Sequence, residues 1–310
     1  MPSCMNDTER TADERHPSPK DLVDGLVTLL TPEETVGHDI YRGPRKGDGV
    51  GRVFGGQVIA QALRAAEMTV EDDRPPHSLH AYFLRGGSED YDIELAVDRQ
   101  FDGRSFSNRR VVAKQKGTPI LNLAASFQRP EEGLEHVDAT MPDVPSADEL
   151  RPEMEIRAEM ANSLEDERAR EFMLRPRAIE LRNIDAPHWQ SSEPRDPVSH
   201  TWFRAVAPMP DDASLHRAAL AYASDYMLLG TSALPHGLSW WRNELKGASL
   251  DHAVWFHRPA RLDEWLLYAT DSPWSGGGRG FNRGSVFNQD GELVASVAQE
   301  GVIRKMRKDS

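Results

Sequence analysis

Ala81-Tyr82-Phe83-Leu84-Arg85 and Val254-Trp255-Phe256-His257-Arg258, 173 positions apart, follow one pattern. Each is an aromatic, apolar run that ends in arginine, and such a composition favours a β-strand. A pattern that returns at a nearly constant offset indicates an internal repeat, which decides the architecture before any single motif does.

Further pairs of segments lie at nearly the same offset on the C-terminal side of these runs. Gly103-Arg104-Ser105-Phe106 matches Gly278-Arg279-Gly280-Phe281 at an offset of 175, and the run 123–128 matches 294–299 at an offset of 171. Lys116-Gly117 and Asp290-Gly291 are typical of tight hairpin turns between long strands. We therefore expect each half to end in antiparallel hairpins.

The N-terminal part of each half also follows a common order of two short strands and an apolar helix. The first half offers strands Ile40-Tyr41-Arg42 and Arg52-Val53-Phe54 and the helix 57–67; the second offers strands 179–182 and 201–204 and the helix 215–229. A long antiparallel sheet must bury one face, and the single apolar helix of each half can cover it. This α+β arrangement is the hotdog fold, and two tandem copies predict a double hotdog.

Composition divides the rest of the chain. We expect a disordered leader at 1–19, an N-terminal hotdog at 20–130 with a short helix from Asp21, a charged linker with a helix-like run at 131–176, a C-terminal hotdog at 177–306 and a tail at 307–310.

The charge balance and the single cysteine exclude several classes of protein. The net charge of −13 argues against a nucleic-acid binder, which needs a basic face. Cys4 alone forms neither a disulfide framework nor a thiolate metal cage. No apolar run approaches the ~18 residues of a membrane span, and the N-terminus lacks a signal-peptide core. We therefore expect a soluble, cytoplasmic protein.

Familiar catalytic motifs are absent from the sequence. There is no P-loop, no G-x-G-x-x-G and no G-x-S-x-G nucleophile elbow. His77 and His80 form a His-x-x-His pair without a third nearby ligand, so ordinary hydrogen bonding is the better interpretation, and no metal site is predicted.

Asp225 is the most anomalous residue of the chain. It follows the apolar run 218–224 and precedes Leu228 and Leu229, on a helix that should be buried. A buried carboxylate must be hydrogen-bonded, paired or functional. The residues alone leave a structural role and a catalytic role about equally supported.

Gln299 and Ser249 carry weaker signals. Gln299 shares a strand face with Leu293, Ala295 and Val297 by period-two alternation, and Ser249 precedes the aromatic run of the second half. By themselves they are best interpreted as a polar residue at the edge of an apolar face and a turn serine.

The sequence resembles the bacterial type II acyl-CoA thioesterases (TesB-like) and their peroxisomal relatives from about residue 21 to 304. The stretches that carry the resemblance are 52–58, 78–87, 102–111, 222–225, 251–259 and 299–301. The resemblance implies a double hotdog whose catalytic group falls on Asp225, Ser249 and Gln299. Ser249 is the loosest of these matches, because threonine is familiar at that position in the family.

The resemblance implies hydrolysis of medium- or long-chain acyl-CoA by an activated water, without metal or cofactor, in a homodimer or homotetramer. Arginines able to meet the CoA phosphates are Arg85, Arg104, Arg109, Arg258, Arg279 and Arg283, none of which the sequence singles out as a ligand. The alternatives are a non-catalytic acyl-CoA-binding protein and an enoyl-CoA hydratase. The hydratase is disfavoured because Gly230, not histidine, lies five residues after Asp225.

Overall fold

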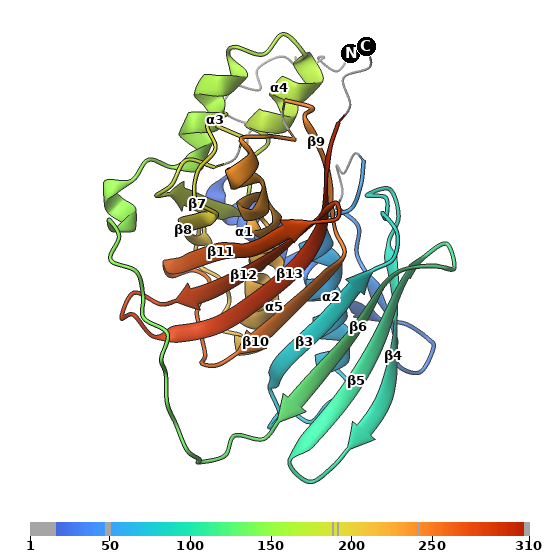
Figure 1. The fold of residues 1–310 in the computed structure, drawn as a ribbon. Helices are drawn as coiled ribbons and strands as arrows, with labels where there is room; N and C mark the ends of the chain where they lie inside the picture. The colour runs from blue at the N-terminus through green and yellow to red at the C-terminus, as the bar shows by residue number, and fades with distance from the viewer. Residues whose placement is uncertain (1–16, 47–50, 188, 191, 241, 307–310) are drawn as a thin grey trace, which may run out of the picture.

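The computed structural model describes residues 17–46, 51–187, 189–190, 192–240 and 242–306, which form one continuous antiparallel sheet with helices on one side of it (Figure 1). Most of the expected leader and the whole tail 307–310 therefore lie outside the described residues. No helix of the described ranges is long and apolar enough to cross a membrane.

The first half consists of α1 (Pro19–Leu29), β1 (Glu33–Glu34), β2 (Ile40–Gly43), α2 (Gly55–Glu67), β3 (Pro76–Phe83), β4 (Ile93–Asp102), β5 (Phe106–Gln115) and β6 (Thr118–Gln128). Helix α1 begins earlier than expected because Ser18 and Asp21 form a reciprocal capping box and Pro19 occupies the first turn. Positive φ angles at Lys116 (49°) and Gly117 (73°) produce the tight turn between β5 and β6.

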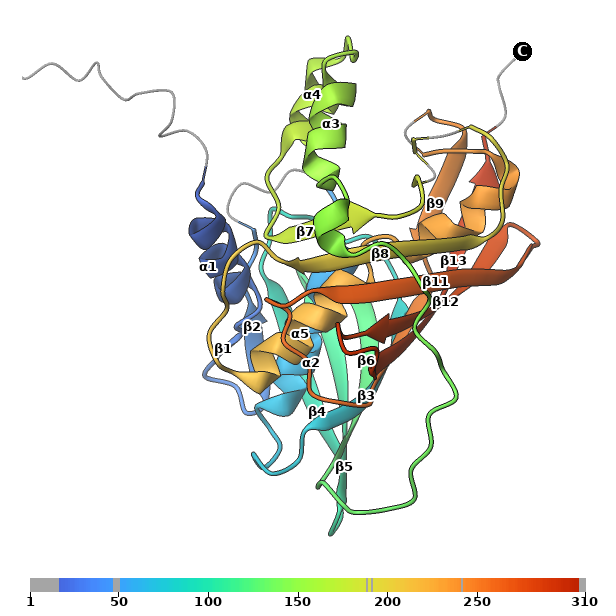
Figure 2. The same ribbon diagram turned by 90° about the vertical axis from the view of Figure 1, so that its left-hand side faces the viewer.

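The second half consists of β7 (Ile179–Asn183), β8 (Val198–Ala205), α5 (Ala213–Ser224), a 3₁₀ helix (Leu228–His236), β9 (Leu245–Ser249), β10 (Asp251–Phe256), β11 (Leu266–Gly276), β12 (Arg279–Phe287) and β13 (Leu293–Lys305). The segment between the halves holds a 3₁₀ turn (Ala147–Glu149), α3 (Glu153–Ala161) and α4 (Glu167–Leu174). The single helix-like run expected there is thus two helices, which project beyond the sheet (Figure 2).

The strand order confirms the double hotdog. It runs β1-β2-β4-β5-β6-β3-β10-β13-β12-β11-β8-β7, with β9 pairing with β13. The two aromatic strands, β3 and β10, pair antiparallel with Leu79 opposite Val254, so the repeated segments meet at the centre of the sheet. Helices α2 and α5 pack against each other on one side of this sheet (Figures 1 and 2).

Three expectations about elements were wrong. First, Arg52-Val53-Phe54 is not a strand; it forms an isolated bridge between Arg52 and Ser88, and Phe54 becomes the N-cap of α2. Second, β2 corresponds to β8 and not to β7, because β2 and β8 are the strands that pair with β4 and β11.

Third, helix α5 ends at Ser224 instead of continuing to Leu229. The hydroxyl of Tyr268 donates to the Ser224 carbonyl at 3.1 Å, and that carbonyl is the one that the amide of Leu228 would need in a continued helix. Asp225 is consequently the C-cap, with φ −85° and ψ −7°.

Candidate active site

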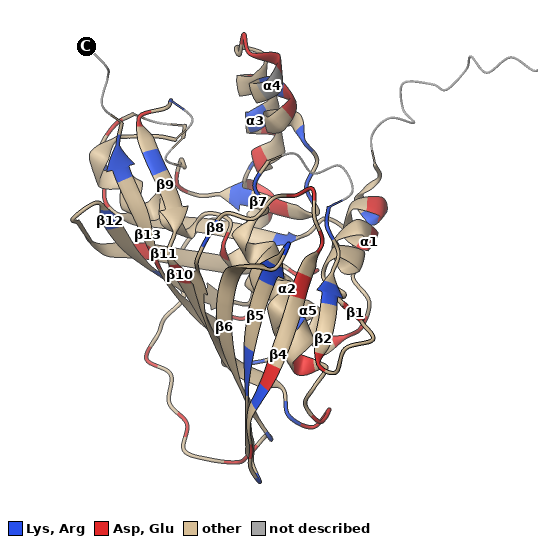
Figure 3. Ribbon diagram, turned by 90° about the vertical axis from the view of Figure 1, so that its right-hand side faces the viewer, with Lys and Arg blue, Asp and Glu red and all other residues tan. Residues whose placement is uncertain are grey.

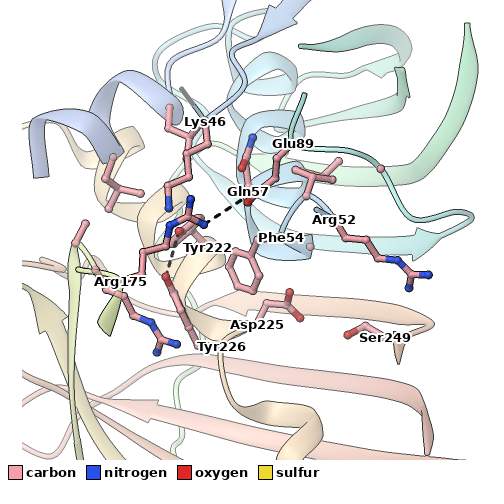
Figure 4. Close-up of a pocket in the computed structure, with 18 of the residues that line it drawn as sticks. Lys46, Arg52, Phe54, Gln57, Glu89, Arg175, Tyr222, Asp225, Tyr226 and Ser249 are labelled. Atoms are coloured by element: carbon pink, nitrogen blue, oxygen red, sulfur yellow. Dashed lines mark hydrogen bonds and ion pairs between the residues drawn. The ribbon is translucent and has the colours of Figure 1, made fainter. Parts of the chain in front are cut away.

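A large cavity lies where the start of α2, the end of α5 and β9 meet, and α1, α3 and α4 complete its wall. Its volume is about 1410 Å³. Leu22, Leu26 and Leu29 line it from α1, and Phe172 and Met173 line it from α4. Asp225 and Ser249 both line the same cavity (Figure 4).

Asp225 is held between the two central helices. A Cβ on Gly55 would lie 2.7 Å from Asp225 Oδ2, and a Cβ on Gly56 would lie 2.4 Å from the Tyr222 carbonyl oxygen. The two glycines therefore allow the first turn of α2 to reach the end of α5. The positive end of the α2 dipole faces the carboxyl group as a result.

Burial governs the protonation of Asp225. Only 6 % of its side chain is exposed, and burial raises its pKa from the usual 3.8 to about 6. The Gln299 amide and the Gly56 backbone N–H both donate to the carboxylate and hold the pKa below what burial alone would give. The carboxylate is thus poised to exchange a proton near neutral pH.

Gln299 reaches Asp225 from the centre of β13. Its Nε2 donates to Asp225 Oδ1 at 2.6 Å and also approaches Nδ1 of His252 at 3.1 Å. Gln299 is fully buried, and its Oε1 has no hydrogen-bond partner among the described residues. The structure thus brings two of the three predicted site residues into direct contact.

Ser249 approaches from β9, the strand beside β13. It ends β9 and pairs in register with Gly301, two residues after Gln299. Figure 4 shows its side chain on the Asp225 side of the cavity, and no hydrogen bond joins it to Asp225 or Gln299 in the described structure. A molecule held between them would be needed to link the three groups.

The arginines suggested by the sequence fall mostly outside the cavity. Of the six, only Arg85 lines it. Arg109 pairs with Asp102, Arg258 with Glu292, Arg279 with Glu300 and Arg283 with Asp271. The other cations that line the cavity are Arg45, Lys46, Arg52, Arg157, Arg175 and Arg177.

Those cavity cations lay outside the sequence prediction because they come from loops and linker helices. Arg157 is buried, and burial lowers its pKa to about 10, so its guanidinium remains protonated at neutral pH. Both Arg157 and Arg177 approach the buried carboxylate of Glu153. Nothing in local spacing indicates that Arg157 of α3 and Arg177, just before β7, would lie at the cavity.

Two further polar groups of the site were missed by sequence reasoning. Tyr268, on β11, is buried below the end of α5, where its hydroxyl bonds the Ser224 carbonyl. His252 is fully buried on β10. A signal for His252 exists, because period-two alternation places it on the same face as Val254 and Phe256.

The first half places different residues where the second half builds this site. Met68 caps α2 as Asp225 caps α5. Arg109 is 1 % exposed and donates to the hydroxyl and the carbonyl oxygen of Thr69, just beyond that cap. Its guanidinium therefore occupies the end of the first central helix, and the carboxylate arrangement is built once in the described chain.

Comparisons with known proteins agree on one family. The family model described as acyl-CoA thioesterase matches residues 187–302, and the model for the acyl-CoA thioesterase N-terminal domain matches residues 44–128. Acyl-CoA thioesterase 2 of Haemophilus influenzae is 37 % identical, over 92 % of this chain and 98 % of its own length. Human acyl-coenzyme A thioesterase 8 is 36 % identical, over 98 % of this chain and 96 % of its own length.

A solved structure gives the same relationship. The acyl-CoA thioesterase II TesB2 from Mycobacterium marinum superposes with a TM-score of 0.73 and 38 % sequence identity, covering 91 % of this chain and 98 % of that one.

Proposed function

The chain belongs to the acyl-CoA thioesterase family, and from that premise we propose that it hydrolyses acyl-CoA thioesters with a water activated by Asp225. The observation that carries the proposal is the cavity-lining carboxylate of Asp225, whose pKa burial raises to about 6 and which Gln299 holds at 2.6 Å.

The water would lie between Asp225 and Ser249. Asp225 accepts its proton as the oxygen attacks the thioester carbonyl carbon, and Ser249 orients it through its hydroxyl. The carbon–sulfur bond then breaks, and the proton passes to the departing CoA thiolate, leaving a fatty acid and CoA. Gln299 keeps the carboxylate in place during both transfers.

The first turn of α2 is suited to stabilise the oxyanion. Backbone N–H groups at a helix start point out of the helix, and the dipole there favours negative charge. Gly55 begins this helix beside Asp225. An N–H of this turn would meet the carbonyl oxygen as its charge develops.

The wall of the cavity supports a medium- or long-chain acyl group. Apolar side chains from α1, α4 and the 3₁₀ helix 228–236 line it, Leu26, Met173 and Leu229 among them. A volume of about 1410 Å³ exceeds the ~300–1,000 Å³ of ordinary small-molecule pockets. Arg52 and Arg85 line the same cavity and would supply positive charge for the phosphates of CoA.

Release of free thiol from octanoyl-CoA and palmitoyl-CoA tests the function directly. We expect turnover of both substrates, followed with a thiol reagent. Tight binding without thiol release would instead support an acyl-CoA-binding protein, and hydration of an enoyl-CoA without thiol release would support a hydratase.

Three further statements stay predictions. We expect turnover to survive EDTA, because the proposed base needs no Lewis acid; loss with EDTA and recovery with zinc would contradict this. A homodimer or homotetramer and a cytoplasmic location are expected, and light scattering and cell fractionation would test them.

A further inference from the structure

His252 lies directly behind the site, and the hydrolysis proposed above gives it no role. It sits on β10, one residue beyond the Ala253–Ala298 pair, so it neighbours Gln299 of β13. It is 0 % exposed, and burial lowers its pKa to about 3, so the ring is neutral at the pH at which Asp225 would act. The 3.9 Å between its Nδ1 and Asp225 Oδ1 is therefore not an ion pair.

A chain of hydrogen bonds fixes which ring nitrogen carries the proton. The Ser224 hydroxyl donates to the Ala221 carbonyl at 3.0 Å, so toward His252 it accepts. His252 Nε2 lies 2.8 Å from that hydroxyl and donates to it. Nδ1 is left as an acceptor, and the Gln299 group that faces it at 3.1 Å must be the NH₂.

We propose that His252 is a positioning residue that fixes the amide orientation of Gln299, so that the amide always donates to Asp225. The inference rests on the proposed hydrolysis. A glutamine amide can also rotate by half a turn, so that its oxygen faces Asp225. A protonated Asp225 could donate a hydrogen bond to that oxygen, whereas an ionised carboxylate could not. The acceptor Nδ1 excludes that arrangement because it too requires the NH₂.

The consequence is a bias toward the ionised, proton-accepting form of Asp225. Hydrogen bonds donated to a carboxylate lower its pKa, so loss of the Gln299 donor would raise it. The other groups that face the site are the N–H of Gly56 from α2, the hydroxyl of Tyr268 from β11, and the hydroxyls of Tyr222 in the last turn of α5 and of Tyr226 just beyond it. None of the tyrosines is charged near pH 6, because burial raises the pKa of each.

The test compares His252→Phe with His252→Asn. Phenylalanine removes both ring hydrogen bonds, whereas the asparagine oxygen can still accept from Gln299 near the position of Nδ1. We expect His252→Phe to lower kcat by about 10–100-fold, the range found when outer-shell hydrogen-bond partners are removed at other sites, with KM changed less than about threefold. The acid limb of its profile of kcat against pH should move to higher pH. For His252→Asn, both kcat and the position of the acid limb should lie closer to those of the unaltered protein.

His216→Asn is the matched control. His216 is a second buried histidine, on α5, and its Nδ1 accepts from the Leu262 backbone at 3.0 Å far from Gln299. This variant should keep the acid limb in place even where its melting temperature falls. If His252→Phe does not fold, Ser224→Ala takes its place, since it removes the acceptor that fixes the tautomer and should shift the limb the same way.

A readout independent of turnover separates this inference from the proposed function. With carboxyl-labelled aspartate, the ¹³C resonance missing from Asp225→Asn identifies Asp225, and its titration gives the pKa in each variant. A higher pKa in His252→Phe supports the positioning role even in a protein that releases no thiol. An unchanged pKa, or an acid limb and kcat equal to those of the unaltered protein, would overturn it, as would equal impairment of His252→Asn and His252→Phe.

Discussion

At Asp225, burial opposes the charge that the proposed reaction needs. A carboxylate with 6 % of its side chain exposed is disfavoured, yet only the ionised form accepts a proton. The compromise is a pKa of about 6, which leaves the group ionised at neutral pH but basic enough to take a proton from water.

We expect Asp225→Asn to lose activity without losing the fold. Asparagine has the same shape, so packing beside Tyr222 should persist, but the proton acceptor is gone. The expected loss in kcat is about 10²–10⁴-fold with little change in KM. Steady-state kinetics on palmitoyl-CoA, together with a melting curve, check this; a variant with unaltered kcat would make Asp225 a structural residue.

The pH dependence of stability follows from the same pKa. Because the folded pKa of about 6 exceeds the unfolded value of 3.8, the folded state binds more protons between these pH values. The contribution of this group to the free energy of unfolding therefore falls as pH rises through that window, by about 3 kcal/mol in total.

Urea unfolding at pH 5 and pH 8 would measure this effect, if the free energy of unfolding of the unaltered protein is compared with that of Asp225→Asn, whose side chain cannot ionise. We expect the difference in free energy of unfolding between the two proteins to shift in favour of the asparagine variant as pH rises. A difference that is constant across this range would contradict the raised pKa.

At the scale of elements, the junction of α2 and α5 decides where Asp225 lies. The two central helices pack antiparallel, so the start of α2 meets the end of α5 at Gly56 and Tyr222, and the end of α2 meets the start of α5, where Arg64 donates to Ser214. The approach is close enough that even one methyl group on Gly56 would contact the backbone of Tyr222 at 2.4 Å.

Gly56→Ala should therefore destabilise the protein although alanine favours helix. We expect a loss of about 1–3 kcal/mol, typical of overpacking against a backbone that cannot move away. Thermal unfolding would show it as a lower Tm.

Gly25→Ala is the matched control within a helix. A Cβ at Gly25 meets nothing within 4 Å, so only the helix preference remains and should raise stability by up to about 1 kcal/mol. Equal Tm changes in both variants would contradict the close contact between α2 and α5.

At the scale of the molecule, charged residues are unevenly distributed over the outer face of the sheet. Charged residues lie along β4, which is mostly acidic, and β5, whose charges are all basic, whereas β6 carries none (Figure 3). Tyr82 of β3 is 63 % exposed and Phe106 of β5 is 42 % exposed, and Trp255 of β10 is half-buried beside His80. This charge-poor, aromatic centre is suited to cover by a second copy.

We accordingly expect light scattering at micromolar concentration to return at least twice the chain mass of 34.7 kDa. Tyr82→Lys should shift the mass toward a single chain, because it places a charge at the centre of that face. Glu94→Lys, an exposed change on β4, is the control and should leave the mass unchanged. A single-chain mass for the unaltered protein would contradict the expectation.

The sequence by itself determined the duplicated α+β fold and singled out Asp225, because both depend on local patterns, whereas the family resemblance added Ser249 and the role of Gln299. Aromatic strands, turn glycines and apolar helices recur at a nearly constant offset, and Asp225 and Gln299 each interrupt an apolar pattern of their own element. Only the tertiary structure decided that α5 ends at Ser224, with Asp225 as its C-cap, that β2 corresponds to β8 and that His252 and Gln299 share one hydrogen-bond chain. The tertiary structure alone also decided which cations line the cavity. Each depends on groups far apart in the chain, such as the Tyr268 hydroxyl, which donates to the Ser224 carbonyl. The spacing of residues within one element carries no information about their partners on another element.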